Sequence, residues 1–310
     1  MRFAPTDEQA ALADAVREPL AAADWDALAA MDVFAALVPA DAGGLGLAET
    51  DLVGVLEAAG YAAAPLPVSA TAFVAAPLLA AAGDPRAADV AAGRSRVALA
   101  GLDDPVGLAP FGGHADWILH LDGGSARLGA AAGAPESTVD TTLDAVRSTG
   151  AEVLTGDPAL VGRARLRAGL ALAAELVGLG RRMLDLTVGY VKQRHQFGVP
   201  VGSFQAVKHH LADAALGLEF AAPEVLAAAW AVEHDADAVR AVDAAVVLAA
   251  EAAHATGRVA IQCHGAIGYT VEYELHRYVK RAWALEALCD TGARLDRLAA
   301  SLDLPEATHE

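Results

Sequence analysis

Residues 193–213 read QRHQFGVPVGSFQAVKHHLAD, and residues 262–272 read QCHGAIGYTVE. In these two stretches polar residues and glycines interrupt long, alanine-rich sequence that is compatible with helices. In each stretch an Arg or a Gln stands beside glycines where a helical run ends. Glycine lets a backbone approach a ligand closely, and the Arg or Gln can bind an anion or an adenine ring. The pair predicts a nucleotide-binding site.

The composition limits the classes of protein and ligand. The chain has 310 residues, of which 55% are hydrophobic and 20% are charged, so it can form one large domain or two to three small ones. The net charge of −18 argues against non-specific binding to nucleic acid or to an anionic membrane, because both need clustered Lys and Arg. An anionic ligand must therefore be held by a local cationic site.

The cysteines and the N-terminus indicate a cytoplasmic protein. Cys263 and Cys289 have no metal-like spacing, and no metal-ligand pattern of carboxylates or cysteines is recognised around His195, His209, His210 and His264, so no metal site is expected. Buried thiols are favoured over a disulfide or a nucleophile. Residues 1–9 lack the apolar core of a signal peptide, and Gly, Pro or charge interrupts the apolar tracts elsewhere. We expect neither secretion nor a membrane span.

The first part of the chain, residues 6–93, has a helical pattern. Thr6 and Gln9 predict a capping box, and a helix is expected to open at Thr50 and to close at Gly60. Residues 38–47, VPADAGGLGL, predict a loop, which is not a phosphate loop because no βαβ pattern surrounds it. A short helix is expected to start near Ser69.

The middle part has a different pattern, which predicts a small β-rich module. Short strands are expected at residues 96–100, 116–121 and 151–154, with a turn at 122–124, DGG. Glycine, threonine and β-branched residues fill the rest of the module.

From about Pro158 the chain predicts four long helices, arranged as an up-and-down bundle. The first carries a seam of large apolar residues at spacings of four and three, namely Leu172, Leu176, Leu179, Met183, Leu186 and Tyr190. The second is expected to start at Ser203 with a kink or break at Pro223. The third is expected from about Asp237 to Val259, and the last from near Glu272 towards Leu298.

The two quoted stretches together resemble the C-terminal bundle of flavin-dependent acyl-CoA dehydrogenases, and residues 38–47 resemble the first domain of that family. The resemblance covers nearly the whole chain in the family's order. It implies a mostly α fold with a small β domain. The implied parts are an N-terminal helical domain (1–94), a reduced β-rich domain (95–157) and a C-terminal four-helix bundle (158–310).

The resemblance also implies FAD as the cofactor. In the family, the Arg and Phe of the first motif contact the FAD pyrophosphate and pack against the cofactor, which corresponds here to Arg194 and Phe197. The second motif lines the adenosine end with Gln262, Cys263 and Ala266. The full expected set adds Gln196, Val201, Phe204 and Thr291. In the family this ADP-binding half acts across a subunit interface, so these residues are expected to serve a partner's cofactor.

The family's chemistry needs a carboxylate that removes the α-proton of an acyl-CoA thioester. At the two positions where relatives carry this base, the chain has Cys289 and Ala168. Asp290, one residue displaced, and Glu175, two helical turns after Ala168, are the substitute candidates. A helix C-cap for Asp290 and an interface hydrogen bond for Glu175 are the favoured interpretations.

The β module is also shorter than in relatives, and residues 102–107 are at best a remnant of a loop that holds the flavin. These losses resemble the reduced subunit of heteromeric acyl-CoA dehydrogenases. Residues 64–67 and 264–280 resemble the bacterial branch that acts on bulky steroid side-chain CoA thioesters. The expected protein is thus an oxidoreductase subunit of lipid β-oxidation, in an α2β2 heterotetramer that passes electrons to an electron-transfer flavoprotein.

Two alternatives stay open. One is a self-sufficient homo-oligomeric dehydrogenase that uses Asp290 or Glu175 as its base. The other is a non-enzymatic assembly protein that kept the fold and lost the cofactor.

Overall fold

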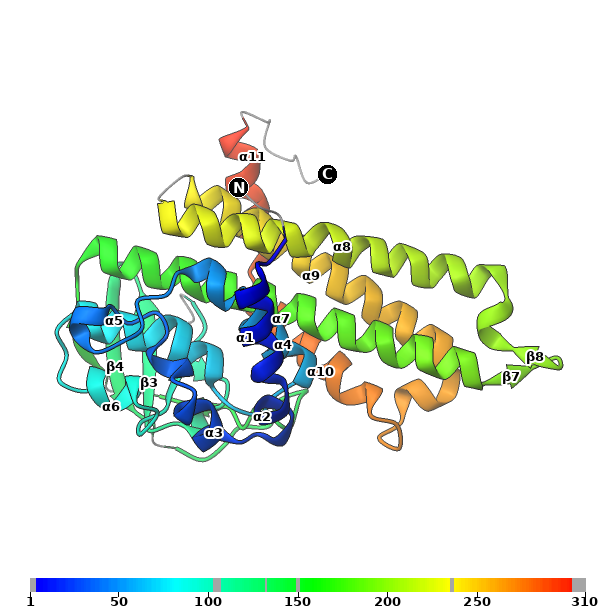
Figure 1. Cartoon of the computed structure of the whole chain (residues 1–310), viewed down its shortest axis with the longest axis horizontal. Coiled ribbons are helices and arrows are strands. Elements are labelled where there is room, and N and C mark those ends of the chain that lie inside the picture. Colours follow the sequence, from blue (N-terminus) through cyan, green and yellow to red (C-terminus); the bar gives the residue numbers. More distant parts are fainter. Residues whose placement is uncertain (1–3, 103–106, 132, 149–150, 235–236, 303–310) are drawn as a thin grey trace.

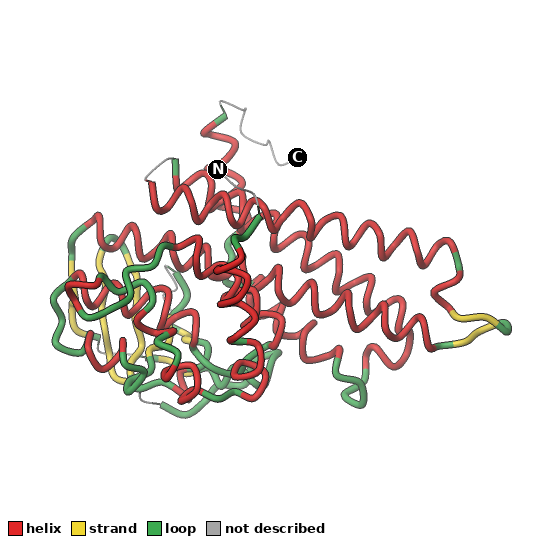
Figure 2. Tube along the Cα trace, in the orientation of Figure 1, coloured by secondary structure: helices red, strands yellow, loops and turns green. Residues whose placement is uncertain are grey.

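The computed structural model describes residues 4–102, 107–131, 133–148, 151–234 and 237–302. A bundle of long helices extends from a part in which shorter helices pack beside a small sheet (Figure 1). Colouring by secondary structure places the main strands at one end and a separate two-stranded hairpin at the opposite end (Figure 2).

The first part is helical, as predicted. Its elements are α1 (Asp7–Ala15), α2 (Arg17–Ala22), α3 (Trp25–Ala30), α4 (Glu49–Ala62), a π-helical segment η3 (Ala70–Ala75), α5 (Ala76–Ala81) and α6 (Ala87–Ala91). The Thr6 side chain accepts from the backbone N–H of Gln9, and the Gln9 side chain accepts from the backbone N–H of Thr6. The predicted capping box is therefore confirmed.

Gly60 does not end α4, contrary to the expectation. The helix continues to Ala62, and Ala63 stops it in a left-handed conformation with φ of 46°. A Cβ at Gly60 would overlap the backbone carbonyl of Glu175 on α7 (Pro158–Gln193). This glycine therefore permits close helix packing rather than a turn.

The sheet has the strand order β1-β3-β4-β6. Its strands are β1 (Val97–Leu99), β3 (Trp117–Asp122), β4 (Ser125–Ala130) and β6 (Glu152–Thr155), and β2 (Leu108–Ala109) pairs separately with β5 (Val146–Arg147). β1 is parallel to β3, whereas β3 and β4 form an antiparallel hairpin. Gly123 and Gly124 supply the positive φ values of its turn, at the predicted position. The domain boundaries expected from the sequence, at residues 94/95 and 157/158, fall between α6 and β1 and between β6 and the next helix.

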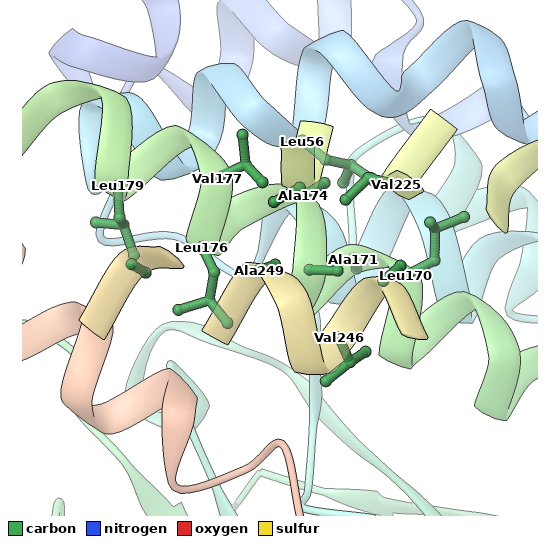
Figure 3. Close-up of a cluster of buried hydrophobic side chains, with 14 of the residues drawn as sticks. Leu56, Leu170, Ala171, Ala174, Leu176, Val177, Leu179, Val225, Val246 and Ala249 are labelled. Carbon is green, nitrogen blue, oxygen red and sulfur yellow. The ribbon is translucent and has the colours of Figure 1, made fainter. Parts of the chain in front are cut away.

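The bundle consists of α7, α8 (Gln205–His234), α9 (Ala238–His264), α10 (Leu275–Glu286) and α11 (Thr291–Ser301). The predicted seam of α7 is buried at its centre, where Leu176, Leu179 and Met183 have no exposed surface. Side chains from α4, α7, α8 and α9 meet in this core (Figure 3). The core thus joins the first part of the chain to the bundle.

The bundle helices differ from the expectations at three places. Of the kink or break expected at Pro223, the break does not occur. α8 continues through the proline although one helical hydrogen bond is lost, since the flanking Ala221 and Val225 are buried in the core. The last helix is two helices, since Asp290 adopts a left-handed conformation with φ of 44° between α10 and α11. The third helix also continues past Val259 to His264.

α8 and the segment from α9 to Tyr269 are long and apolar enough to cross a membrane by length and composition alone. About half of each apolar window is buried inside the molecule, 44% and 56% respectively. We interpret both as core helices of the bundle, in agreement with their packing against α7.

Candidate cofactor-binding site

The first signature lies where α7 ends. The backbone N–H of Arg194 donates to the carbonyl of Tyr190 at 2.9 Å, and the N–H of Val201 donates to the carbonyl of Arg194 at 2.7 Å. These bonds close a hairpin of β7 (His195–Gln196) and β8 (Val199–Pro200), which projects from the end of the bundle farthest from the sheet (Figure 1). The backbone of Arg194 is thus fixed while its side chain is exposed.

The charges around Arg194 favour an anion. No carboxylate in the described part of the chain lies within ion-pair distance of its guanidinium. Residues 186–212 contain no Asp or Glu, and Lys192 and Lys208 are two of the chain's three lysines. In a protein with a net charge of −18 this stretch is a local cationic site.

The hairpin also presents an exposed aromatic side chain. Phe197, at the turn with φ of 53°, is 93% exposed. Its ring meets the edge of Phe204 at 6.3 Å between centroids. Gln196 is exposed and Val201 is half-buried beside this pair. Phe197 and Phe204 thus form a small exposed aromatic pair at the end of the bundle.

The second signature lies where α9 ends. Gln262 is exposed on the last turn, and Gly265 caps the helix with φ of 63° and ψ of −139°, a conformation that glycine adopts readily. Ala266 is exposed in the following turn. Burial raises the pKa of the Cys263 thiol, so this residue is a small uncharged neighbour of Gln262.

An aromatic cluster joins the two signatures. The ring of Tyr190 stacks on that of His264 at 4.3 Å, and the ring of Tyr273 lies 4.9 Å from His264 and 5.8 Å from Tyr190. Arg194 and Gln262, 68 positions apart, therefore belong to one end of the bundle. The sequence reasoning missed this cluster, because spacing in sequence does not reveal contacts between helices.

Arg258 is a further cationic candidate that the sequence reasoning missed. It lies one helical turn before Gln262, and both side chains are exposed. Within the described ranges no acidic side chain forms an ion pair with it. The spacing of four residues before Gln262 is the signal that could have identified it.

Thr291 is the one predicted cofactor-binding residue that lies elsewhere. It begins α11, which is held against the start of α9 by ion pairs from Arg294 and Arg297 to Asp243 at 2.6 and 2.7 Å. Gln262 is 19 residues further along α9, a helical rise of about 28 Å. The fold thus separates Thr291 from the two signatures of the same chain.

The positions expected for a base carry no accessible carboxylate. Ala168 is buried, and so is Cys289, whose thiol donates to the carbonyl of Leu285 at 3.3 Å. Burial raises the pKa of Cys289 to about 12. Asp290 is exposed and its carboxylate caps the start of α11 by accepting from Ala293 N–H at 3.4 Å. The expected C-cap is therefore an N-cap, because the last helix is split at this residue.

Glu175 lies in a small cavity of about 70 Å³ between α7, η3 and the β module. Ser69 donates a hydrogen bond to its carboxylate, which is the interface hydrogen bond that we expected. The neighbouring walls are mostly apolar and include Ala168, Phe111 and Leu285. Burial raises the pKa of Glu175 above its ordinary value.

A buried ion pair fills the adjoining space. Arg281 on α10 donates to Asp140 at 2.5 Å, to the Thr142 hydroxyl at 2.7 Å and to the carbonyl of Ala64 at 3.1 Å, and its guanidinium lies over the Phe111 ring. It therefore ties the β module and the end of α4 to the bundle.

A separate cavity of about 400 Å³ lies between α1, α4, α7 and α8. Its wall contains the ion pair of Glu57 with Arg181, and none of the predicted site residues lines it. Among the described residues, no cluster of His, Cys, Asp or Glu is arranged to hold a metal ion.

The chain is similar in sequence to known acyl-CoA dehydrogenases. Residues 165–288 match the model of the acyl-CoA dehydrogenase C-terminal domain. The chain is 36% identical over 255 residues to acyl-CoA dehydrogenase IpdE2 of Mycobacterium tuberculosis, which covers 80% of this chain and 76% of that protein. It is 34% identical to acyl-CoA dehydrogenase FadE34 of the same organism, over 82% of this chain but only 38% of that longer protein.

Solved structures share the fold. A chain of the ChsE4–ChsE5 complex from Mycobacterium tuberculosis matches with a TM-score of 0.83 and 23% identity, over 99% of this chain and 100% of that chain. A chain of the Tcur3481–Tcur3483 steroid ACAD matches with a TM-score of 0.81 and 24% identity, over 96% and 97%. These matches confirm the predicted fold class, a mostly α protein with a small β part.

Proposed function

Because the chain belongs to the acyl-CoA dehydrogenase family, we propose that it is the FAD-completing, non-catalytic subunit of a heteromeric α2β2 acyl-CoA dehydrogenase. The family consists of oxidoreductases that use FAD, as the resemblance in the sequence implied. In this proposal the chain offers its ADP-binding half to a full-length partner, and the partner holds the flavin ring and the base.

One observation supports the proposal: the two signature residues are exposed, whereas the positions expected for the base carry no carboxylate. Arg194 and Gln262 are exposed at one end of the bundle, whereas Ala168 and Cys289 are buried and cannot act as carboxylate bases. A self-sufficient enzyme would need both halves.

The exposed residues suit FAD. This cofactor supplies the hydride acceptor of the family's reaction. The planar guanidinium of Arg194 fits a pyrophosphate and keeps its charge, and the Gln262 amide can both donate to and accept from an adenosine. Phe197 offers an exposed ring against which the cofactor can pack. Since these groups face outwards, they fit a cofactor bound between subunits.

The small space beside the expected base positions argues against an acyl group on this chain. The cavity at Glu175, about 70 Å³, is half the size of the roughly 150 Å³ cavity that accommodates benzene. Arg281 and Phe111 fill the space beside it. A bulky acyl chain would have to bind in the partner subunit.

The assembly and the substrate are proposed by analogy. The name of the ChsE4–ChsE5 complex gives two proteins, and the Tcur3481–Tcur3483 protein is named a steroid ACAD. Both motivate a heteromer that acts on a steroid side-chain or similarly bulky acyl-CoA. We further propose an electron-transfer flavoprotein as the electron acceptor and the cytoplasm as the location.

Glu175 favours a second candidate, a self-sufficient homo-oligomer. It is a carboxyl group with a raised pKa in a cavity beside Ala168, which is the environment of many general bases. Its small cavity and its hydrogen bond to Ser69 favour the structural role instead.

Purification of the chain alone and together with a full-length partner encoded beside it tests the proposal. We expect little FAD on the lone chain, one FAD per two chains in the complex, and acyl-CoA oxidation only by the complex. Glu175→Gln and Asp290→Asn should leave that oxidation unchanged. Stoichiometric FAD and oxidation by the lone chain would instead establish the homo-oligomer, and a partner complex without flavin would favour an assembly protein.

A further inference from the structure

We propose that Tyr190, His264 and Tyr273 form a positioning cluster that sets the placement of Gln262 relative to Arg194, and that the affinity for FAD depends on it. The inference rests on the proposed function and extends it to three residues that need not contact the cofactor themselves. The three side chains come from the end of α7, the end of α9 and the segment before α10.

The contacts form a closed triangle. The rings of Tyr190 and His264 are nearly parallel, 23° apart, at a centroid distance of 4.3 Å, whereas Tyr273 meets Tyr190 at 64° and 5.8 Å. His264 and Tyr273 complete the triangle at 4.9 Å. Stacked and edge-to-face arrangements at these distances are the favoured geometries for such rings, so the triangle defines a preferred relative position of its three segments.

Two corners of the triangle, Tyr190 and His264, are directly connected to signature residues. The carbonyl of Tyr190 accepts the backbone N–H of Arg194 at 2.9 Å, which fixes the start of the hairpin. His264 is the last residue of α9 and lies two positions after Gln262. A shift between the Tyr190 and His264 rings would therefore change the distance between the guanidinium of Arg194 and the amide of Gln262. Two side chains that bind one ligand from separate segments give a lower affinity for that ligand when the distance between them is not fixed before binding.

The burial and the hydrogen bond of His264 indicate that its ring has a defined position. The residue is only 4% exposed, and its Nδ1 lies 2.7 Å from the carbonyl of Ala260, so Nδ1 carries the proton. Burial lowers the pKa of His264, which keeps the ring neutral between the two tyrosines. Its buried Nε2 has no hydrogen-bond partner among the described residues. The ring is therefore held by one hydrogen bond within α9 and by stacking on the two tyrosines, and only the stacking connects it to the other two segments.

The chain offers a matched control. On α8 the rings of Trp230 and His234 are stacked at 4.3 Å, and Nδ1 of His234 lies 2.8 Å from the Trp230 carbonyl. This pair has nearly the same geometry as Tyr190 and His264, but it is at the other end of α8 from the hairpin. Its loss should leave FAD binding unchanged.

FAD dissociation constants of the complex with the partner subunit, measured by flavin fluorescence, test the cluster. Tyr190→Leu and His264→Leu should each weaken FAD about tenfold, with kcat at saturating FAD unchanged, because a stacked ring pair contributes on this scale. Tyr190→Phe keeps the ring and loses only the long hydrogen bond of 3.4 Å from the Tyr190 hydroxyl to the His264 carbonyl, so it should bind FAD nearly as the native chain does. His234→Leu should have no effect.

The outcomes separate this inference from the proposed function. If Arg194→Ala loses FAD while Tyr190→Leu keeps it, the cluster has no positioning role and the proposed function stands. If the native complex binds no FAD, both are wrong. A tenfold loss in Tyr190→Leu that is matched by Leu176→Ala, a core variant without contact to the signatures, would also overturn the inference, since general destabilisation would then explain it.

Discussion

Arg281 and Asp140, 141 residues apart, form an ion pair in which Nε of Arg281 lies 2.5 Å from Oδ2 of Asp140 and both side chains are at most 3% exposed. Such a pair offers little net stability relative to apolar residues, but removal of one partner leaves a buried charge without compensation. The pair therefore specifies where the β module is attached to the bundle.

Arg281→Met should lower the free energy of unfolding by about 3–5 kcal/mol, because the Asp140 carboxylate would remain buried without its cation. Urea denaturation measures the change. Arg17→Met is the control, since Arg17 pairs with Asp14 at the surface with both side chains more than half exposed, and it should cost less than about 1 kcal/mol. Equal losses in the two variants would show that the buried pair has no special role.

Gly178→Ala should destabilise the protein by about 1–3 kcal/mol, because its Cβ would overlap the backbone carbonyl of Glu57 where α4 crosses α7. Gly189→Ala, on the same helix, should be neutral or stabilising by up to about 1 kcal/mol, since no atom lies within 4 Å of the added Cβ. Thermal melts of the two variants decide the matter. A destabilised Gly189→Ala variant would contradict the packing argument.

The stability of the protein should depend on pH through Glu175. Burial raises the folded-state pKa of this carboxyl above 4.5, so the folded protein binds its proton more tightly than the unfolded chain does. The contribution of Glu175 is therefore fully present below pH 4.5 and is lost as the pH rises towards the folded-state pKa, by up to about 1.4 kcal/mol per pH unit.

Glu175→Gln should reduce the decrease of the free energy of unfolding with pH above pH 4.5, measured by urea denaturation. Part of the slope should stay, because burial also raises the pKa values of Glu57 and Glu286. Glu251→Gln, an exposed position on α9, should keep all of it. If Glu175→Gln and the native chain lose stability in parallel over this range, the carboxyl of Glu175 is not the group responsible.

Patterns within single elements could be predicted from the sequence. The Thr6 capping box, the glycine turn between β3 and β4, and the buried seam of α7 follow from local chemistry and helical spacing. Expectations failed where a contact distant in sequence decides the structure. Gly60 adjoins Glu175, and the break at Asp290 lets Arg294 reach Asp243, neither of which a local pattern contains.

The candidate site divides in the same way. Arg194 and Gln262 could be identified as candidate site residues from the sequence because each signature is continuous. The stacking of Tyr190 on His264 and the separation of Thr291 from both signatures were not, because they depend on how α7, α9 and α11 pack. The sequence already shows that Ala168 and Cys289 carry no carboxylate. Their burial and the small size of the cavity near them could be learned only from the fold.

Arg194→Ala should weaken FAD binding by the complex of the chain with its partner about 10- to 100-fold, the usual effect of removing hydrogen bonds to a charged group. Arg194→Lys should recover only part of the affinity, because an ammonium keeps the charge but lacks the planar pair of donors that matches a pyrophosphate. Arg240→Ala is the control. Arg240 is an exposed arginine at the start of α9, the opposite end from Gln262, where it pairs with Asp237, and its removal should leave FAD binding unchanged. Flavin absorbance after gel filtration gives the occupancy of each variant. Full occupancy in Arg194→Ala would remove the residue from the cofactor site, and equal loss in Arg240→Ala would mean that net charge, rather than a specific contact, holds the cofactor.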